Sequence, residues 1–155
     1  MSLSHYEELL KELGGILGSN LAPDKNQSCL LHFPAQGINI QIDLDHDGEK
    51  LLIGTQVGIV PPGPYREKVF KQALIDNGSA HFSRGILAYS EKNHSLVLFQ
   101  YLFLAGLNGM KLNQFLEIFL QHAHAWVEAI FRGEIPQYQK EEVVDSKEHF
   151  FGLSK

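Results

Sequence analysis

The segment from residue 111 to residue 131 constrains this chain most strongly, because its apolar residues recur at helical spacing over about six turns. These residues are Leu112, Phe115, Leu116, Phe119, Leu120, Ala123, Trp126, Val127 and Ile130. Spacings of three and four place them on one wide face of a helix, with Asn108 and Gly109 before its start and Gly133 and Pro136 at its end. Such a helix is about 30 Å long, and its apolar face needs a flat apolar surface to pack against.

Alternating residues upstream predict that surface as an antiparallel sheet. Residues 38–44 alternate between apolar and polar types throughout, which is typical of a half-buried strand with its isoleucines turned inward. Residues 29–33 and 51–60 are the neighbouring strands, and the composition of residues 45–48 is that of a hairpin turn. A second hairpin is predicted from residues 85–90 and 95–104.

Two further helices are predicted around these strands. The first covers residues 4–17 and begins with the spacing of a capping box at Ser4, and the second covers residues 64–77. Gly14 and Gly15 each cost about 1 kcal/mol relative to alanine in a helix interior, which weakens the second half of the first helix. A weak helix with a leucine face can shift to meet a partner, although the same leucines can equally complete the core.

The order of elements, α-β-β-β-α-β-β-α, predicts an α+β fold in which helices cover a twisted antiparallel sheet. The chain has 155 residues, of which 44% are hydrophobic, so one domain with a sizeable core is expected over residues 1–133. After Gly133 the sequence loses its periodicity and becomes charged. Residues 134–155 are therefore expected to form a flexible tail, in which only Phe150 and Phe151 could dock.

The strand at residues 95–104 is apolar on both faces, since leucines occupy one side and Val97, Phe99, Tyr101 and Phe103 the other. A strand of this kind needs cover on both faces. Helices of the same chain can cover one of them. The sequence therefore predicts that the other face meets a second subunit or a bound chain.

Composition excludes several other classes of protein. The formal net charge of −5 argues against a nucleic-acid partner, which would need a concentrated basic face. The single cysteine, Cys29, cannot form an intramolecular disulfide and suits a reducing cytosol. The N-terminus lacks the pattern of a signal peptide, and the longest apolar run, residues 96–107, is too short for membrane insertion.

The sequence contains no motif for catalysis or for a cofactor. Residues 43–48 are similar to the start of a calcium loop, but Gly54 stands where that loop needs glutamate, and a hairpin turn explains the same residues. His122 and His124 lie about 200° apart around a helix and cannot share a zinc ion there. Cys29 has apolar neighbours, which favours an inert core thiol over a nucleophile. The sequence therefore predicts neither a metal site nor an enzyme.

Several of these segments together resemble a known family. They are the first helix with Tyr6-Glu7-Glu8-Leu9-Leu10, the three-stranded meander, the second helix ending in Ala73-Leu74-x-x-Asn77, the hairpin of residues 85–98, and the closing helix with Ala123-x-x-Trp126. Over residues 4–132 the chain resembles the class I chaperones of bacterial type III secretion, the Tir chaperone (CesT/SycE-like) family. The phrases ELLKELG, FKQALIDNGS and LNGMKL are most similar to SycE-like chaperones of chlamydiae.

The resemblance implies a small acidic homodimer, or a heterodimer with a sister chaperone, that uses no ATP or other cofactor and acts in the bacterial cytoplasm. It implies that the chain binds the N-terminal segment of a secreted effector and keeps that segment unfolded for export. The implied client-binding residues are Leu9, Leu13, Leu17, Leu30, Phe33, Ile38, Ile40 and Ile42. The implied dimer contacts are Val69, Phe70, Ala73, Leu74, Ile86, Ala88, Val97 and Phe99.

A second hypothesis is a small-ligand binder or an enzyme on the same α+β scaffold. It would use a closed pocket lined by Phe99, Tyr101 and Trp126 with a nearby histidine. The two hypotheses differ in shape, because a chaperone needs an open apolar groove and the alternative needs a closed cavity with convergent polar groups. A dimer that binds no client would use the same residues and is the third alternative.

Overall fold

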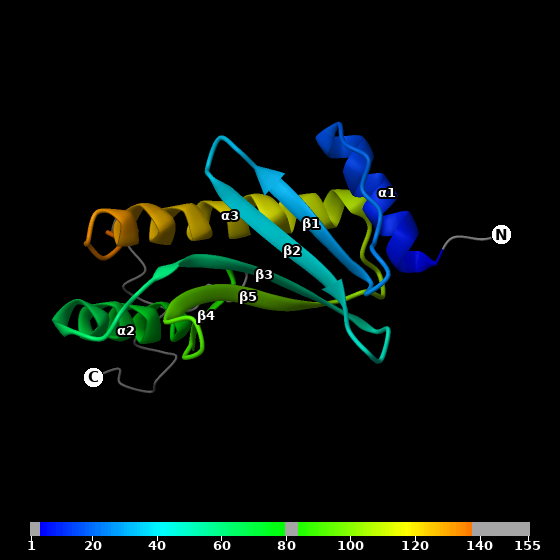
Figure 1. The fold of residues 1–155 in the computed structure, drawn as a ribbon. Coiled ribbons are helices and arrows are strands. Elements are labelled where there is room, and N and C mark those ends of the chain that lie inside the picture. The colour runs from blue at the N-terminus through cyan, green and yellow to red at the C-terminus, as the bar shows by residue number, and fades with distance from the viewer. Residues whose placement is uncertain (1–3, 80–83, 138–155) are drawn as a thin grey trace, which may run out of the picture.

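A computed structural model describes residues 4–79 and 84–137 of the chain, and the description below is confined to them. Its helices and strands follow one another along the sequence as shown in Figure 1. They are α1 (His5–Leu17), β1 (Ser28–Phe33), β2 (Ile38–Leu44), β3 (Lys50–Ile59), α2 (Pro64–Asn77), β4 (Ile86–Ser90), β5 (Ser95–Phe103) and α3 (Gly109–Phe131). The order is the one predicted, and the fold is α+β.

The strands form one antiparallel sheet in the order β1-β2-β3-β5-β4. The long central neighbours β3 and β5 pair from Lys50↔Phe103 to Ile59↔Ser95. The helices α1 and α3 lie together on one face of the sheet, and α2 lies beside β4 at one end (Figure 1). The strands β1 and β4 are therefore the two edges of the sheet.

The core lies between α1, α3 and the covered face of the sheet. The buried side chains of α3 include Leu112, Leu116, Phe119, Ala123 and Trp126, as the helical spacing predicted. Ile38, Ile40 and Ile42 of β2 are also buried, which confirms the prediction that the isoleucines point inward. Tyr6 of α1 packs against β2 and donates a hydrogen bond to the carbonyl of Ile42 at 2.8 Å.

Local signals in the sequence fix the ends of the helices. The side chain of Asn108 caps α3 by accepting a hydrogen bond from the backbone N–H of Lys111 at 2.9 Å. Ser4 caps α1 in the same way by accepting from Glu7 at 3.2 Å. Gly133 follows α3 with a φ of 69°, a left-handed conformation that favours glycine. The observed α3 begins slightly earlier than its apolar periodicity predicted.

The sheet opens between β2 and β3, because β2 pairs with β3 only over residues 41–44. Beyond that point the hydroxyl of Thr55 donates to the carbonyl of Asn39 at 2.7 Å. Gly58 of β3 contacts α3 so closely that a Cβ atom there would lie 2.6 Å from the Ile130 side chain. The strand β3 thus stays against α3 while β2 diverges from β3 (Figure 1). We refer to the unpaired stretch between residues 38–40 of β2 and residues 55–59 of β3 as the slot.

Candidate functional site

The face of the sheet opposite α1 and α3 is not covered by the described residues, although much of it is apolar. In β5, Leu96 and Leu98 are buried under the helices, whereas Tyr101 is 47% exposed and Phe103 is 69% exposed. One apolar side of β5 is therefore covered by the chain itself and the other is open, as its two-sided pattern predicted. We refer to the uncovered side of β1, β2, β3 and β5 as the open face.

A groove of about 810 Å³ crosses the open face. At the slot between β2 and β3 it reaches Val127 of α3. Phe99 and Tyr101 meet edge to face at one side of it, with their ring centroids 6.3 Å apart. The groove is open to solvent, which suits an extended chain better than a small molecule. Its apolar lining includes Leu30, Leu52, Val97, Phe99 and Tyr101, and its polar lining includes Asn39, Gln41 and Gln56.

The outer edge of β1 is free at Leu30 and His32. The backbone N–H of Leu44 donates to the carbonyl of Gln27 at 3.0 Å, which sets the phase of the β1–β2 ladder. In an antiparallel ladder these groups alternate, so the N–H and C=O groups of Leu30 and His32 point away from β2. No described residue forms a hydrogen bond with them. The side chain of Leu30 lines the groove, so the free edge and the groove adjoin each other.

A second apolar surface lies on α2 and β4. Leu74 is 73% exposed, and Ile75 and Ile86 are exposed as well. Phe70 meets Tyr89 edge to face at 4.9 Å between ring centroids, and the guanidinium of Arg66 lies over both rings. The aromatic pair fixes α2 beside β4, and the exposed leucine and isoleucines lie near it without cover from the described residues.

The client-binding residues implied by the resemblance are divided between the core and the surface. Leu9, Leu13, Ile38, Ile40 and Ile42 are buried in the core of the chain itself. Leu17 and Leu30 are exposed, and Phe33 is half-buried. Alternation distinguished the two faces of β2 correctly, but it does not tell which face the helices cover. Leu52 also lines the groove and was not among the residues implied by the resemblance. Its outward position in the alternating strand β3 is the signal that could have indicated it.

The implied dimer residues come together on α2, β4 and β5. Leu74 and Ile86 are exposed, and Phe70, Ala88, Val97 and Phe99 are half-buried. Val69 and Ala73 are buried and hold α2 against the rest of the chain. The accessible members therefore lie on elements that contact one another, and Val97 and Phe99 also line the groove.

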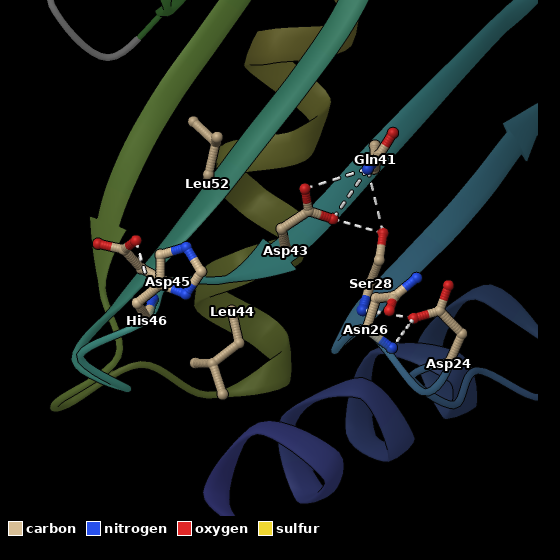
Figure 2. A pocket seen from close by; sticks show the side chains of 9 residues that line it. All are labelled: Asp24, Asn26, Ser28, Gln41, Asp43, Leu44, Asp45, His46 and Leu52. Carbon is tan, nitrogen blue, oxygen red and sulfur yellow. Dashed lines mark hydrogen bonds between the residues drawn. The ribbon is translucent and has the colours of Figure 1, made fainter.

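A polar pocket lies next to the groove, where β1 begins and β2 ends (Figure 2). The carboxylate of Asp24 accepts from the backbone N–H of Ser28 at 3.0 Å, and the backbone N–H of Asp24 donates to the Ser28 carbonyl at 2.8 Å. The Ser28 hydroxyl donates to Asp43, and the Gln41 amide donates to both carboxylate oxygens of Asp43. These hydrogen bonds tie β1 to β2, so the fold accounts for Asp24, Ser28, Gln41 and Asp43 of the pocket.

Residues 45–48 form the hairpin turn that joins β2 to β3. The N–H of Gly48 donates to the carbonyl of Asp45 at 2.9 Å, and Gly48 has a φ of 72°. The hairpin interpretation of this segment is therefore confirmed. Within residues 4–79 and 84–137, no three His, Cys, Asp or Glu side chains are grouped so that they could hold a metal ion. No helix among the same residues combines the length and apolar character needed to cross a membrane.

Burial sets the protonation of the groups most suited to chemistry. Burial raises the pKa of the Cys29 thiol, and Asp24 adds to the shift, so the thiol stays protonated and unreactive. Burial lowers the pKa of His122, while Asp76 opposes the shift and Arg84 adds to it. Both groups lie inside the fold, away from the open face, and neither is prepared to act on a bound molecule.

The small-ligand hypothesis predicted a closed pocket lined by Phe99, Tyr101 and Trp126, and this prediction is wrong. Trp126 is fully buried on the helical side of the sheet, where its indole N–H donates to the carboxylate of Asp76 at 3.1 Å. Phe99 and Tyr101 line the groove on the open face. Because the sheet stands between Trp126 and the other two, the three side chains cannot line one cavity.

Comparison with known proteins identifies the family to which this sequence is similar. The model of the Tir chaperone protein (CesT) family matches residues 8–127, which is most of the chain. A search of curated protein sequences found no match to this chain.

Several solved structures share the fold. A chain of the ExsC–ExsE complex is 24% identical, with a TM-score of 0.67, and the match covers 83% of this chain and 96% of that chain. A chain of the HopA1–SchA chaperone–effector complex is 19% identical, with a TM-score of 0.65 and coverage of 81% and 94%. The third is from the Yersinia pestis type III secretion chaperone SycH in complex with a stable fragment of YscM2, with 14% identity, a TM-score of 0.59 and coverage of 76% and 96%.

Proposed function

Since the chain belongs to the Tir chaperone protein (CesT) family, we propose that it is a type III secretion chaperone that binds the N-terminal segment of a secreted effector. It keeps this segment unfolded and competent for export. It acts by binding alone and catalyses no reaction. The observation that carries the proposal is an uncovered apolar sheet face that adjoins a free strand edge.

The free edge and the groove supply different parts of client binding. The N–H and C=O groups of Leu30 and His32 can pair with the main chain of an extended segment, whatever its sequence. The groove then receives alternate side chains of that segment against Leu30, Leu52 and Tyr101. We do not expect Leu9, Leu13, Ile40 and Ile42 in this contact, because they are buried in the core of the chain. Ile38 is buried as well, but it lines the groove.

A second copy of the chain is the partner proposed for α2, β4 and β5. Leu74, Ile86 and Phe99 would lie at the centre of that contact. A stable pair should bury at least about 1,000 Å² in total, and the exposed apolar residues of these elements offer a nucleus for it. Val97 and Phe99 belong to both surfaces, so the partner subunit would form one wall of each groove. A sister chaperone could take the place of the identical copy.

The proposed location is the bacterial cytoplasm, where effectors are loaded before export. The buried and protonated thiol of Cys29 suits a reducing compartment. Two of the structures that share the fold are a chaperone–effector complex and a secretion chaperone bound to a protein fragment, and both support the assignment as a secretion chaperone.

The test is co-expression of the chain with the proteins encoded beside its gene, followed by mass spectrometry of the polypeptide that co-purifies. We expect the N-terminal segment of one secreted protein, held in a form that protease digests once it is released. Recovery of the chain with no polypeptide, or with folded proteins only, would contradict the proposal.

The same complex tests the site. Leu30→Asp places a charge in the groove and should weaken client affinity at least about tenfold, because burying an unpaired carboxylate costs more than about 1.4 kcal/mol. Ile118→Asp is the matched control, since Ile118 is also an exposed apolar residue but lies on α3, away from the open face. Equal affinity of the two variants would exclude the groove as the client site.

A further inference from the structure

The two edges of the sheet differ in how their main-chain groups are satisfied. On β1 the outward N–H and C=O groups of Leu30 and His32 form no hydrogen bond with a described residue. On β4 the corresponding groups of Leu87 are both taken by the side chain of Asn77. The Leu87 N–H donates to Oδ1 of Asn77 at 2.8 Å, and Nδ2 of Asn77 donates to the Leu87 carbonyl at 2.8 Å.

These two hydrogen bonds copy those of a neighbouring strand. Leu87 lies opposite Leu98 of β5, and its main-chain groups point away from β5 toward the outer edge. A primary amide offers one acceptor and two donors, so it can satisfy the N–H and the C=O of one residue at once. The alternative orientation of the amide would place donor against donor, which fixes the assignment of the two atoms. Asn77 therefore occupies the position that another strand would need.

The C-terminal end of α2 is held by hydrogen bonds, and these fix the position of the Asn77 side chain relative to β4. The N–H of Gly78 donates to the carbonyl of Leu74 at 3.1 Å and closes the last turn of the helix. Asp76 accepts from the indole of Trp126, so the same turn is fixed to α3. The sequence motif Ala73-Leu74-x-x-Asn77 thus acquires a physical reason: Ala73 packs against the core, Leu74 stays on the surface and Asn77 reaches the sheet edge.

We propose that Asn77 is a positioning residue that assigns different roles to the two edges of the sheet. It closes β4 to main-chain pairing at Leu87 and leaves the outward groups of Tyr89 as the remainder of that short strand. An extended polypeptide therefore adds to β1, where the groups of Leu30 and His32 are both open. An unprotected edge strand pairs with other chains and leads to aggregation, which gives this closure a value of its own. The client half of the statement rests on the proposed function. A second copy that contacts α2, β4 and β5 would then meet this chain through side chains, without a sheet continuous across the two subunits.

The first test uses the full chain alone, so it needs no client. In Asn77→Ala the amide hydrogen exchange of Leu87 should accelerate at least about tenfold, while that of Leu98 changes little. Light scattering should show species larger than those of the unmodified chain, growing with protein concentration. Asn113→Ala is the matched control, because Asn113 is also a helical asparagine but bonds only Glu117, at 3.4 Å. Exchange and mass equal to those of the control would overturn the proposal.

The second test separates edge closure from general support of the fold. Asn77→Asp keeps an acceptor for the Leu87 N–H and loses the donor for the Leu87 carbonyl. In Asn77→Asp we expect the amide hydrogen of Leu87 to exchange more slowly than in Asn77→Ala, while the stability of α2 is the same in both variants. If both variants accelerate exchange equally, and across β5 as well as β4, then Asn77 only supports the fold and the proposal fails. A chain without any client could still pass both tests, so this proposal and the proposed function can fail separately.

Discussion

At the scale of single residues, the adjacent glycines Gly14 and Gly15 of α1 have different surroundings. A Cβ atom at Gly14 would lie 2.3 Å from the carbonyl oxygen of Ser19, and Gly14 also accepts the N–H of Ser19 at 2.9 Å. A Cβ atom at Gly15 would meet nothing within 4 Å. The first glycine is therefore required by close packing of the turn after α1, and the second is a replaceable position in an exposed part of the helix.

We predict opposite effects for the two alanine substitutions. Gly15→Ala should raise the free energy of unfolding by about 0.5–1 kcal/mol, because alanine loses less conformational entropy in a helix. Gly14→Ala should lower it, because the new methyl group displaces backbone. Urea denaturation of both variants measures the difference. If Gly15→Ala is more stable but binds the client less well, the second half of α1 must move during binding, and unchanged affinity excludes that movement.

His122 makes the stability of the chain depend on pH. Burial lowers its pKa in the folded state, with Asp76 opposing the shift and Arg84 adding to it. As the pH falls, His122 of the unfolded chain therefore binds a proton at its usual pKa of about 6.5, which is a higher pH than in the folded chain. Stability should therefore be complete above that pH and fall as the pH drops through and below it, toward the folded pKa.

Urea midpoints measured from pH 8 to pH 5 check this prediction about His122. The variant His122→Gln should show a shallower decline than the unmodified chain. His46→Gln is the control, because His46 lies exposed in the hairpin between β2 and β3 and should leave the slope unchanged. A decline of the same steepness in all three proteins would assign the pH dependence to other groups.

At the scale of elements, the sequence predicts what depends on local patterns. The alternation of β2, the caps at Ser4 and Asn108 and the two apolar sides of β5 each depend on neighbours in the chain, and all are found. The choice between the two faces of the sheet depends on where α1 and α3 pack, which is a tertiary property. For this reason the sequence identified the isoleucines of β2 as inward but did not tell that the inward face packs against the helices of the same chain.

The edge of β4 shows the same limit for the candidate site. The motif containing Asn77 was visible as a family likeness, but its reason required the contact with Leu87, ten residues later in the chain. The slot between β2 and β3 could not be foreseen either, because it results from β3 staying against α3 at Gly58 while β2 diverges. Sequence therefore gives the surfaces that are apolar, and only the assembled fold tells which of them remain uncovered.

The helix α2 carries the prediction about self-association. Leu74 is 73% exposed on it, so Leu74→Glu should leave the fold of the single chain intact. In a dimer that buries this position, the unpaired carboxylate should cost several kcal/mol and reduce association at least about a hundredfold. Light scattering at micromolar concentration measures the mass, with Ile118→Glu as the control on α3. A dimer of unchanged strength in both variants would exclude α2 from the interface.

At the scale of the whole molecule, one layer of helices covers one face of one sheet, and what is left over is available for partners. The free edge of β1 lies at one edge of the sheet, and α2 lies beside β4 at the other. The proposed client and the proposed second copy can therefore bind at the same time. They share only Val97 and Phe99 at the groove. This arrangement predicts that client binding and dimerisation support each other, because each completes a wall for the other.

The last prediction concerns where the folded unit ends. The expected boundary was residue 133, with residues 134–155 as a tail, most of which lies outside the described residues. The hydroxyl of Tyr65 donates to the carbonyl of Glu134 at 2.7 Å, and Pro136 is buried, so the chain continues to contact α2 beyond Gly133.

A protein ending at residue 137 should keep the melting temperature and client affinity of the full chain. One ending at residue 133 should lose about 1 kcal/mol of stability with the Tyr65 hydrogen bond. Calorimetry of the two truncations, with Tyr65→Phe in the longer one as control, decides between the boundaries, and equal stability of all three would place the end of the unit at residue 133.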